Sequence, residues 1–248
     1  MKDPSDLNPT GRFSDRVEDY VKYRPTYPAA AVDCALQGVP PGTIVDVGAG
    51  TGIWTGLLAG RGRAIIALEP NAEMRAAAPA LPGLTWQGGT AEATGLAEAS
   101  AALVTVAQAF HWFRADEALN EFARVLVAGG HVALVWNRRS TADPFTLGYR
   151  EAILSVGAET AAEMMPFDPG VFQRSGVFAA PVRHVFPHAQ ELDRAGLHGR
   201  ARSASYVPKA GPRAEELGAR LDALFDLHAR ADRVRLVYEC EVYKATRR

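Results

Sequence analysis

Cysteine, net charge and long hydrophobic runs are all scarce in this chain of 248 residues. Its two cysteines, Cys34 and Cys240, belong to no CxxC or Cys/His cluster, so we expect neither a disulfide framework nor a zinc site. No His, Asp and Glu residues have the spacing of metal ligands, and we predict no metal. The formal charge of -1 is unlike that of duplex-binding proteins, so we expect no nucleic-acid partner.

No apolar run approaches the ~18 residues of a membrane span, and residues 1–6 lack the apolar core of a secretion signal. These absences predict a cytoplasmic protein without membrane contacts. A chain of this length also buries enough surface to fold without disulfides or metals. The sequence leaves the oligomeric state open between monomer and homodimer.

Apolar runs typical of buried strands alternate with helical periods between residues 44 and 136. Strands are expected at 44–47, 64–69, 84–87, 101–107 and 131–136, and helices at 28–37, 51–59, 71–78 and 116–126. Gly129 and Gly130 are expected to end the last of these helices. Strands that alternate with helices favour an α/β fold with a doubly wound, mostly parallel, Rossmann-like sheet.

The pattern is less regular after residue 139. Strands are expected at 182–186 and 234–243, and helices at 149–156, 192–202 and 214–229. Residues 140–181 are too many for a connector, and we interpret them as a helical, substrate-facing insertion. The chain then divides into an N-terminal lid and first helix (1–39), a core (40–139), the insertion (140–181) and a C-terminal part that completes the sheet (182–248).

A glycine-rich turn follows the first expected strand, at Gly48, Gly50 and Gly52. Glycines at alternate positions let a ligand approach the backbone closely. The order GxGxG differs from the dinucleotide fingerprint GxGxxG, and the absence of GxxxxGK[ST] excludes a P-loop NTPase. Asp46 precedes the turn, and Glu69 ends the second strand, where a carboxylate can accept both ribose hydroxyls of an adenosine.

The GxGxG order, with an acidic residue two positions before it, resembles motif I of the class I S-adenosylmethionine (SAM)-dependent methyltransferases. The segment Gln108-Ala109-Phe110-His111-Trp112-Phe113 is similar to a motif of one subgroup, methyltransferase type 11 or trans-aconitate methyltransferase-like. That subgroup's opening segment is matched by Tyr20, Tyr23, Arg24, Pro25 and Tyr27. The resemblance covers residues 13–137, and residues 182–245 fit its topology. It implies seven strands in the order 3-2-1-4-5-7-6, the last of them antiparallel, with the insertion after strand 5.

The resemblance further implies that SAM is the cofactor and that the core, 40–139, binds it. Glu69 would then bind the ribose, Arg24 would pair with the methionine carboxylate and Gln108 would lie beside the sulfur. The family brackets adenine at positions 90–92, where Thr90 replaces the usual acid and Glu92 is an alternative. The positions that match SAM-binding motifs are Tyr23, Arg24, Asp46, Gly48, Ala49, Gly50, Gly52, Glu69, Pro70, Thr90, Ala91, Glu92, Gln108 and Ala109.

The acceptor is expected near His111, Trp112, Arg138, Ser203 and Tyr206. His111 follows the fourth strand, where the methyl group would point, and a histidine can take a proton from a hydroxyl at neutral pH. It can equally donate a hydrogen bond to a carboxylate acceptor, which needs no base because it is already ionised at pH 7.

Arginines such as Arg138, Arg139 and Arg200 could clamp an acidic acceptor through bidentate contacts. Nearly all of the 27 basic residues are arginines, however, which indicates codon bias. Each of the three is therefore expected on the solvated surface.

These residues predict an enzyme, a SAM-dependent methyltransferase that modifies a small molecule. O-methylation of a carboxylate or hydroxyl, by in-line displacement at the sulfonium methyl, is the expected reaction. One alternative is an NAD(P)-dependent oxidoreductase, which the glycine spacing and the lack of a Tyr-x-x-x-Lys set disfavour. The other is a non-catalytic SAM-binding module that regulates a partner. A nucleic-acid methyltransferase is disfavoured because no Asn/Asp-Pro-Pro-Tyr/Phe motif follows the fourth strand.

Overall fold

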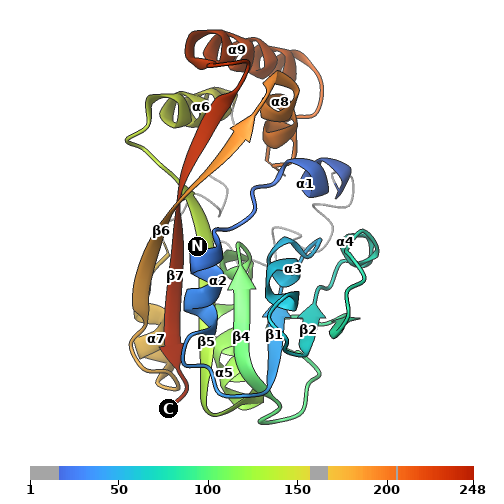
Figure 1. Ribbon diagram of the computed structural model, residues 1–248, viewed down its shortest axis with the longest axis vertical. Helices are drawn as coiled ribbons and strands as arrows, with labels where there is room; N and C mark the ends of the chain where they lie inside the picture. The colour runs from blue at the N-terminus through green and yellow to red at the C-terminus, as the bar shows by residue number, and fades with distance from the viewer. Residues whose placement is uncertain (1–16, 157–166, 205) are drawn as a thin grey trace.

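The computed structural model describes residues 17–156, 167–204 and 206–248, and its centre is a seven-stranded sheet (Figure 1). The strand order is β3-β2-β1-β4-β5-β7-β6, and β7 is antiparallel to both of its neighbours. This confirms the order and the antiparallel last strand expected from the sequence. The strands are β1 (Thr43–Val47), β2 (Ile65–Leu68), β3 (Leu84–Gln87), β4 (Ala101–Ala107), β5 (Leu126–Arg139), β6 (Val182–Leu192) and β7 (Val234–Thr246).

Helices cover both faces of the sheet, with α2 and α3 in front of it and α5 behind it in the view of Figure 1. The central strand β4 is buried from Ala101 to Val106, because its apolar run packs against helices on both sides. The helices are α1 (Val17–Tyr23), α2 (Ala29–Leu36), α3 (Ile53–Ala59), α4 (Ala72–Ala76), α5 (Ala115–Val125), α6 (Pro144–Ser155), α7 (Gly170–Ser175), α8 (Arg194–Arg202) and α9 (Pro212–His228), with a 3₁₀ turn η3 (Phe110–Trp112).

A second apolar core lies beyond the end of the sheet, where α6, α8 and α9 pack against β7 (Figure 1). Tyr149, Leu197, Leu221 and Leu236 are buried there. We call this assembly of α6, α8 and α9 the cap. The strand β4 points toward it, and the parallel strand β1 has the same direction (Figure 1). Residues at the carboxyl ends of these strands therefore lie between the sheet and the cap.

Two expected boundaries, the end of a helix and the end of a strand, are wrong. The helix α5 ends at Val125, and Gly129 and Gly130 lie inside β5, next to a register irregularity between β4 and β5. The strand β6 continues to Leu192, well beyond residue 186, because it stays paired with β7 up to Val234. A mostly polar strand at the edge of a sheet shows little alternation of apolar and polar residues, so this pattern does not predict where the strand ends.

The insertion is helical where it is described, with α6 and α7, while residues 157–166 lie outside the described residues. Its two helices lie apart, since α6 belongs to the cap and α7 packs against α5. Part of the expected N-terminal lid, residues 1–16, is also outside the described part of the chain. No helix in the described ranges has the length and apolar character needed to cross a membrane.

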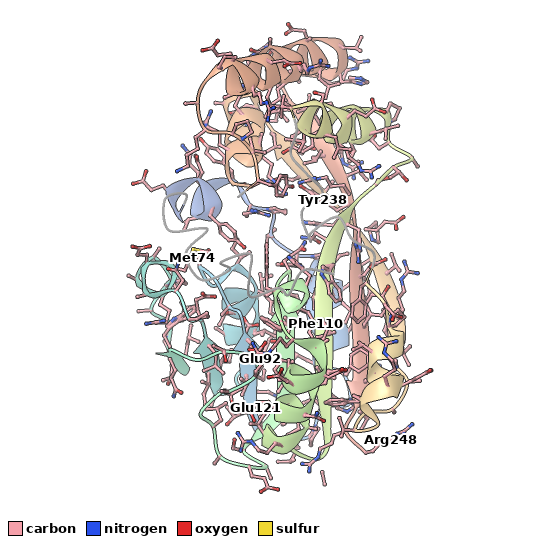
Figure 2. All side chains as sticks on the ribbon, turned by 180° about the vertical axis from the view of Figure 1, so that it is seen from behind. Met74, Glu92, Phe110, Glu121, Tyr238 and Arg248 are labelled. Carbon is pink, nitrogen blue, oxygen red and sulfur yellow. The ribbon has the colours of Figure 1, made fainter. Side chains whose placement is uncertain are left out.

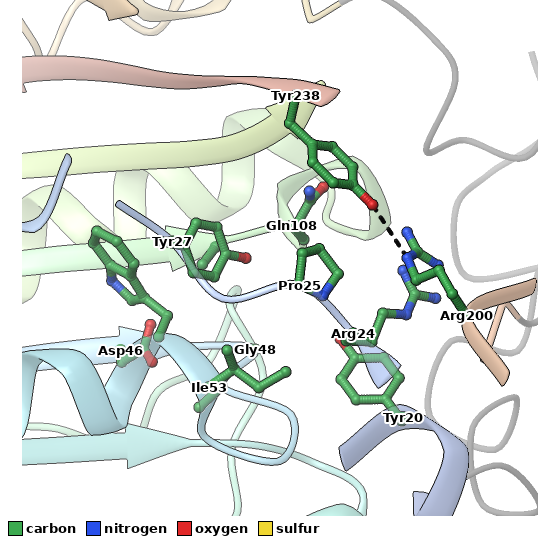
Figure 3. A pocket seen from close by; sticks show the side chains of 13 residues that line it. Tyr20, Arg24, Pro25, Tyr27, Asp46, Gly48, Ile53, Gln108, Arg200 and Tyr238 are labelled. Carbon is green, nitrogen blue, oxygen red and sulfur yellow. Dashed lines mark hydrogen bonds between the residues drawn. The ribbon is translucent and has the colours of Figure 1, made fainter. Parts of the chain in front are cut away.

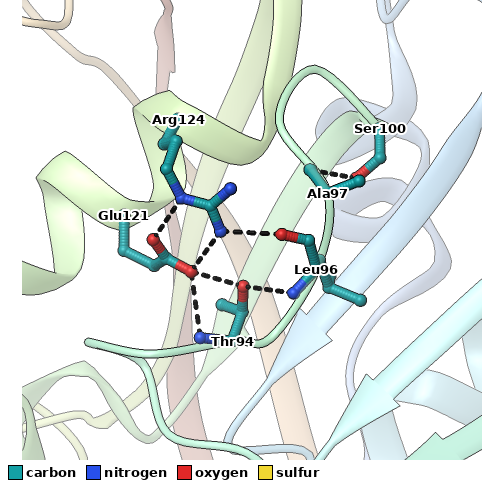
Figure 4. Close-up of polar contacts among 6 residues, drawn as sticks. All are labelled: Thr94, Leu96, Ala97, Ser100, Glu121 and Arg124. Carbon is teal, nitrogen blue, oxygen red and sulfur yellow. Dashed lines mark hydrogen bonds and ion pairs between the residues drawn. The ribbon is translucent and has the colours of Figure 1, made fainter.

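A polar network fixes the loop that follows β3 to α5 (Figure 4). Glu121 Oε1 accepts hydrogen bonds from the backbone N–H and the hydroxyl of Thr94, at 3.0 and 2.5 Å. Arg124 pairs with Glu121 and donates to the carbonyl oxygen of Leu96 at 2.8 Å. The Arg124 guanidinium lowers the pKa of Glu121 to about 2. This network anchors the segment that follows positions 90–92.

Candidate functional site

Three cavities meet between the sheet and the cap, and both Arg24 and Gln108 line all of them. Gln108 follows β4 and has a φ of +57°, a backbone conformation that residues other than glycine adopt rarely. Its Nε2 donates to the carbonyl oxygen of Asn137 at 3.2 Å. Because such strained residues gather at functional sites, this end of β4 is the centre of the candidate site.

The glycine turn lines the first two cavities. Gly48, Gly50 and Gly52 have φ values of +68°, +58° and +84°, so all three have the left-handed conformation that favours glycine. Gly48 lines the first and second cavities, Ala49 the first and Gly50 the second. Gly52 lies elsewhere, since a Cβ atom there would be 3.0 Å from the Trp86 ring. Its lack of a side chain makes room for the Trp86 ring, and the expected direct contact of Gly52 with a ligand stays a prediction.

Glu69 links the turn to the second strand. Its Oε2 accepts the backbone N–H of Gly50 at 2.9 Å, and its Oε1 accepts that of Asn71 at 2.9 Å. Burial raises the pKa of Glu69, and these two hydrogen bonds oppose the rise. Glu69 and Pro70 line the second cavity, where the carboxylate retains lone pairs for hydroxyl donors.

Asp46 is buried at the end of β1 and lines the first cavity. Its carboxylate accepts hydrogen bonds from Thr55 Oγ1 at 2.5 Å and from Thr105 Oγ1 at 3.0 Å. Burial raises the pKa of Asp46 to about 7 despite these hydrogen bonds. Asp46 thus joins β1 to α3 and β4 and holds the base of the glycine turn.

The second cavity gathers most of the residues expected at a nucleoside. Thr90, Ala91, Glu92 and Ala109 line it, together with Trp112, which was expected near the acceptor. Glu92 is also a structural group, since its Oε1 accepts the backbone N–H of Arg114 at 2.8 Å. Tyr20, Gly89 and Phe113, which lie in the segments that resemble family motifs, also line this cavity. Asn71, Met74 and Ala107 complete the lining, and no sequence pattern indicated them. Met74 and Glu92 are labelled in Figure 2, which shows the molecule from the side of α5.

The opening segment contributes Arg24 and Tyr20 (Figure 3). Arg24 donates to the carbonyl oxygen of Ser203 at 3.0 Å, and its guanidinium lies 4.8 Å from the centroid of the Tyr20 ring. Tyr23, which was expected at the cofactor, packs against α8 instead. A Cβ atom at Gly199 would lie within 2.2 Å of the Tyr23 ring, so only glycine leaves room for it. Tyr20 lines the two cavities in its place.

The third cavity is lined mainly by arginines, and its described lining consists of Arg24, Gln108, Asn137, Arg138, Arg139, Thr141, Arg150 and Arg200. Arg138 forms an ion pair with Glu241, with 3.2 Å between Nε and Oε2. Arg200 is only 3% exposed, and Arg139 Nε is buried. The expectation that Arg139 and Arg200 are surface residues is therefore wrong. The arginine-rich composition that led to this expectation carries no information about which arginines the fold buries.

Ser203 and Tyr206 do not line the three cavities as the described residues define them. Ser203 is fully buried, and its hydroxyl donates to the carbonyl oxygen of Arg200 at 2.8 Å. Tyr206 accepts a hydrogen bond from Arg139 Nη2 at 3.3 Å. Both residues hold arginines in place, and their expected contact with the acceptor stays a prediction.

His111 lies in the turn η3, with its ring 4.8 Å from that of Trp112. Trp112 lines the second cavity, whereas His111 is absent from the described lining of the three cavities. The expected role of His111 in catalysis stays a prediction. In the described residues no cluster of His, Cys, Asp or Glu could hold a metal ion.

Comparisons with known proteins agree with this geometry. Residues 45–134 match a family described as "Methyltransferase domain". An uncharacterised methyltransferase-like protein of Schizosaccharomyces pombe is 30% identical over 250 residues, which cover 94% of each chain. The chain belongs to the class I SAM-dependent methyltransferases. SAM is accordingly the cofactor, and the oxidoreductase alternative is not favoured.

This methyltransferase also resembles an uncharacterised methyltransferase of Mycobacterium tuberculosis, with 42% identity over 131 residues. That match spans 51% of this chain and 52% of the relative. The chain therefore covers about half the length of the mycobacterial relatives. The methyltransferase fold is also that of a candidate type II methyltransferase from Anaeromyxobacter dehalogenans, with 22% identity, a TM-score of 0.71 and coverage of 90% of this chain and 97% of that one.

The residues of the first two cavities fit SAM. A Cβ atom at Gly50 would lie 3.6 Å from Met74 Cε and 3.9 Å from the Tyr20 hydroxyl, inside space that the glycine leaves open. Glu69 offers a carboxylate to a ribose, and Arg24 offers a guanidinium to a carboxylate. The second cavity thus suits the adenosine and the smaller first cavity the methionine tail.

Proposed function

We propose that this methyltransferase transfers the methyl group of SAM to an oxygen atom of a small-molecule acceptor, a carboxylate or a hydroxyl. The observation that carries the proposal is the meeting of the three cavities at Arg24 and Gln108. Two of them fit the donor, and the third leaves a separate, strongly basic space for an acceptor.

The donor is bound along the glycine turn. Glu69 accepts hydrogen bonds from the ribose hydroxyls, and positions 90–92 with Trp112 flank the adenine. Asp46 holds the turn from below through Thr55 and Thr105. Because Glu69 is already fixed by two backbone N–H groups, it needs no rearrangement to meet the ribose.

SAM supplies a sulfonium whose methyl group is electrophilic without further activation. The protein must therefore align donor and acceptor and exclude water. Gln108, held by its hydrogen bond to Asn137, marks the point where the donor and acceptor cavities join. Tyr238, at the place where β7 passes from the sheet into the cap (Figure 2), lines the first cavity together with Gln108.

The acceptor binds in the third cavity, which Arg138 lines. A carboxylate acceptor attacks the methyl group without losing a proton, whereas a hydroxyl needs a base. His111 is the candidate base for a hydroxyl acceptor.

Two measurements test this function. Calorimetry with S-adenosylhomocysteine, the demethylated donor, is expected to give micromolar binding; no binding at millimolar concentration would contradict the proposal. Incubation with methyl-labelled SAM and a metabolite extract is expected to label a small molecule. Release of that label as methanol in mild base identifies an ester, and resistance to base identifies an ether. Label on nitrogen or carbon would contradict oxygen as the acceptor atom.

A further inference from the structure

The segment between α1 and α2, residues 24–28, forms one wall of the donor site without regular secondary structure. We call this segment the linker. Its residues Arg24, Pro25 and Tyr27 line the first cavity, which suits the methionine tail of the donor (Figure 3). An irregular segment gains few hydrogen bonds from its own backbone, so other parts of the chain must hold it in place.

Two polar side chains of β6 hold the backbone of the linker. Gln190 Nε2 donates to the carbonyl oxygen of Tyr23, the last residue of α1, at 2.9 Å. The His188 ring forms a hydrogen bond with the backbone of Thr26. These contacts anchor the chain on both sides of Arg24.

The place of these two side chains on β6 is unusual. Successive side chains of a strand point to opposite faces, so the even-numbered residues from 186 to 192 share one face. Phe186 packs against the core of the sheet, and Leu192 is buried in the core of the cap. His188 and Gln190 lie between these two cores, where polar groups are costly unless they are hydrogen-bonded. The linker supplies their hydrogen bonds.

The polar contacts of His188 and Gln190 are confined to the linker and α1 in the described part of the chain. Gln190 Oε1 and His188 Nε2 are buried and have no hydrogen-bond partner there. Burial lowers the pKa of His188, so its ring is neutral at pH 7. Neither residue lines any of the three cavities as the described residues define them. An effect of either side chain on a ligand must therefore pass through the linker.

Arg24 is the residue of the linker that carries charge to the donor. Its Nη2 donates to the carbonyl oxygen of Ser203 at 3.0 Å, and its guanidinium lies 4.8 Å from the centroid of the Tyr20 ring. Asn137 Nδ2, at the end of β5, also donates to the carbonyl oxygen of Thr26 at 2.9 Å. Arg24 is thus fixed at its side chain by α8 and α1 and at its backbone by the sheet. A guanidinium fixed in this way loses little conformational entropy when it binds a carboxylate.

We propose that Gln190 and His188 are positioning residues for donor binding. They hold the linker on the sheet so that the Arg24 guanidinium meets the carboxylate of the donor's methionine. The proposal rests on the proposed function, because it places the methionine tail in the first cavity.

Calorimetry on the full chain with two probes tests the proposal. S-adenosylhomocysteine has the methionine tail, whereas 5′-methylthioadenosine has the adenosine and the sulfur but no amino-acid carboxylate. Gln190→Met keeps the length of the side chain and removes its hydrogen-bond donor. We expect it to weaken the binding of S-adenosylhomocysteine about threefold to tenfold, as the loss of one hydrogen bond predicts. The affinity for 5′-methylthioadenosine should stay unchanged, because that probe has no group for Arg24 to bind.

A double-substitution cycle tests whether the effect passes through Arg24. Arg24→Gln removes the guanidinium that the linker carries and is expected to weaken the binding of S-adenosylhomocysteine by itself. In the Arg24→Gln background, Gln190→Met is expected to cause no further loss, because the group that it positions is gone. An equal loss in the two backgrounds would overturn the proposal.

Gln173→Met is the matched control, because it makes the same substitution at an exposed position of α7, away from the linker (Figure 1). It is expected to bind both probes as the unchanged protein does. His188→Phe carries the conclusion if Gln190→Met proves unstable. It keeps a ring near Tyr238, whose ring centroid lies 6.0 Å from that of His188, and it removes the hydrogen bond to the linker. We expect the same selective loss of S-adenosylhomocysteine binding.

Unchanged affinity for S-adenosylhomocysteine in Gln190→Met and His188→Phe, or an equal loss of affinity for both probes, would overturn the proposal. Failure of the unchanged protein to bind S-adenosylhomocysteine would instead overturn the proposed function.

Discussion

The carboxylate of Glu69 accepts the backbone N–H of Gly50 at 2.9 Å and so connects the glycine turn after β1 to the end of β2. Its second oxygen accepts the N–H of Asn71 at the same distance. One side chain thus fixes the shape of the turn and faces the second cavity. Because the Glu69 carboxylate has both of these roles, a buried acidic side chain is tolerated at this position.

Glu69→Ala is expected to weaken the binding of S-adenosylhomocysteine by about tenfold to a hundredfold, because charged hydrogen bonds of this kind contribute about 1.5–3 kcal/mol. Glu69→Gln is expected to be nearly as damaging, since its amide would present a donor to one of the two backbone N–H groups. Calorimetry measures both. Glu73→Ala, on the exposed face of α4, is the control and should bind normally. Unchanged affinity in Glu69→Gln would show that one carboxylate oxygen suffices.

Gly50→Ala and Gly52→Ala are expected to have different effects although both positions have positive φ. At Gly50 the added methyl enters the second cavity near Met74, so donor affinity should fall at least tenfold. At Gly52 it meets Trp86 at 3.0 Å, so the main result should be a loss of about 1–3 kcal/mol of stability. Thermal unfolding and calorimetry together separate the two effects. Normal donor binding by Gly50→Ala would place the ligand elsewhere.

The doubly wound sheet and the glycine turn could be predicted from the sequence because both depend on local signals. The run from Ala101 to Val106 is apolar apart from Thr105, and the turn glycines directly follow a strand. The resemblance to a family then supplied the order of the seven strands. The ends of β6 could not be predicted, because its partner β7 determines them and the two strands are far apart in the chain.

The basic acceptor cavity could not be predicted because it depends on how the cap packs on the sheet. Arg200 lies on α8 and Arg139 at the end of β5, and only the folded chain brings them together. The choice between Tyr20 and Tyr23 likewise depends on Gly199, whose missing side chain admits the Tyr23 ring against α8. No sequence pattern within the opening segment predicts that contact between Tyr23 and α8.

His111→Asn tests whether the reaction needs a base. For a carboxylate acceptor we expect it to retain most of kcat, and we expect kcat of the unchanged enzyme to be flat between about pH 6.5 and 8.5. Donor binding should also be retained, since His111 is not part of the described cavity lining. The pH profile of kcat for both proteins is the measurement. A fall in kcat at low pH that disappears in His111→Asn would instead assign a hydroxyl acceptor and a histidine base.

Asp46 gives the cofactor-free protein a distinctive dependence of stability on pH. Burial raises its pKa from 3.8 to about 7, so the folded state binds this proton more tightly than the unfolded state does. The stability that the group contributes is therefore complete below about pH 4 and is lost as the pH rises to about 7, by at most about 1.4 kcal/mol per pH unit.

Asp46→Asn isolates this effect, because the hydroxyls of Thr55 and Thr105 can donate to or accept from an amide. The variant is expected to be more stable than the unchanged protein at pH 8, and the difference should shrink as the pH falls toward 5. Other buried acids such as Glu69 contribute equally to both proteins and cancel. Thermal unfolding of the two proteins between pH 5 and 8 measures the difference. Parallel curves over that range would mean that Asp46 is ionised in the folded protein throughout, with a pKa well below 7.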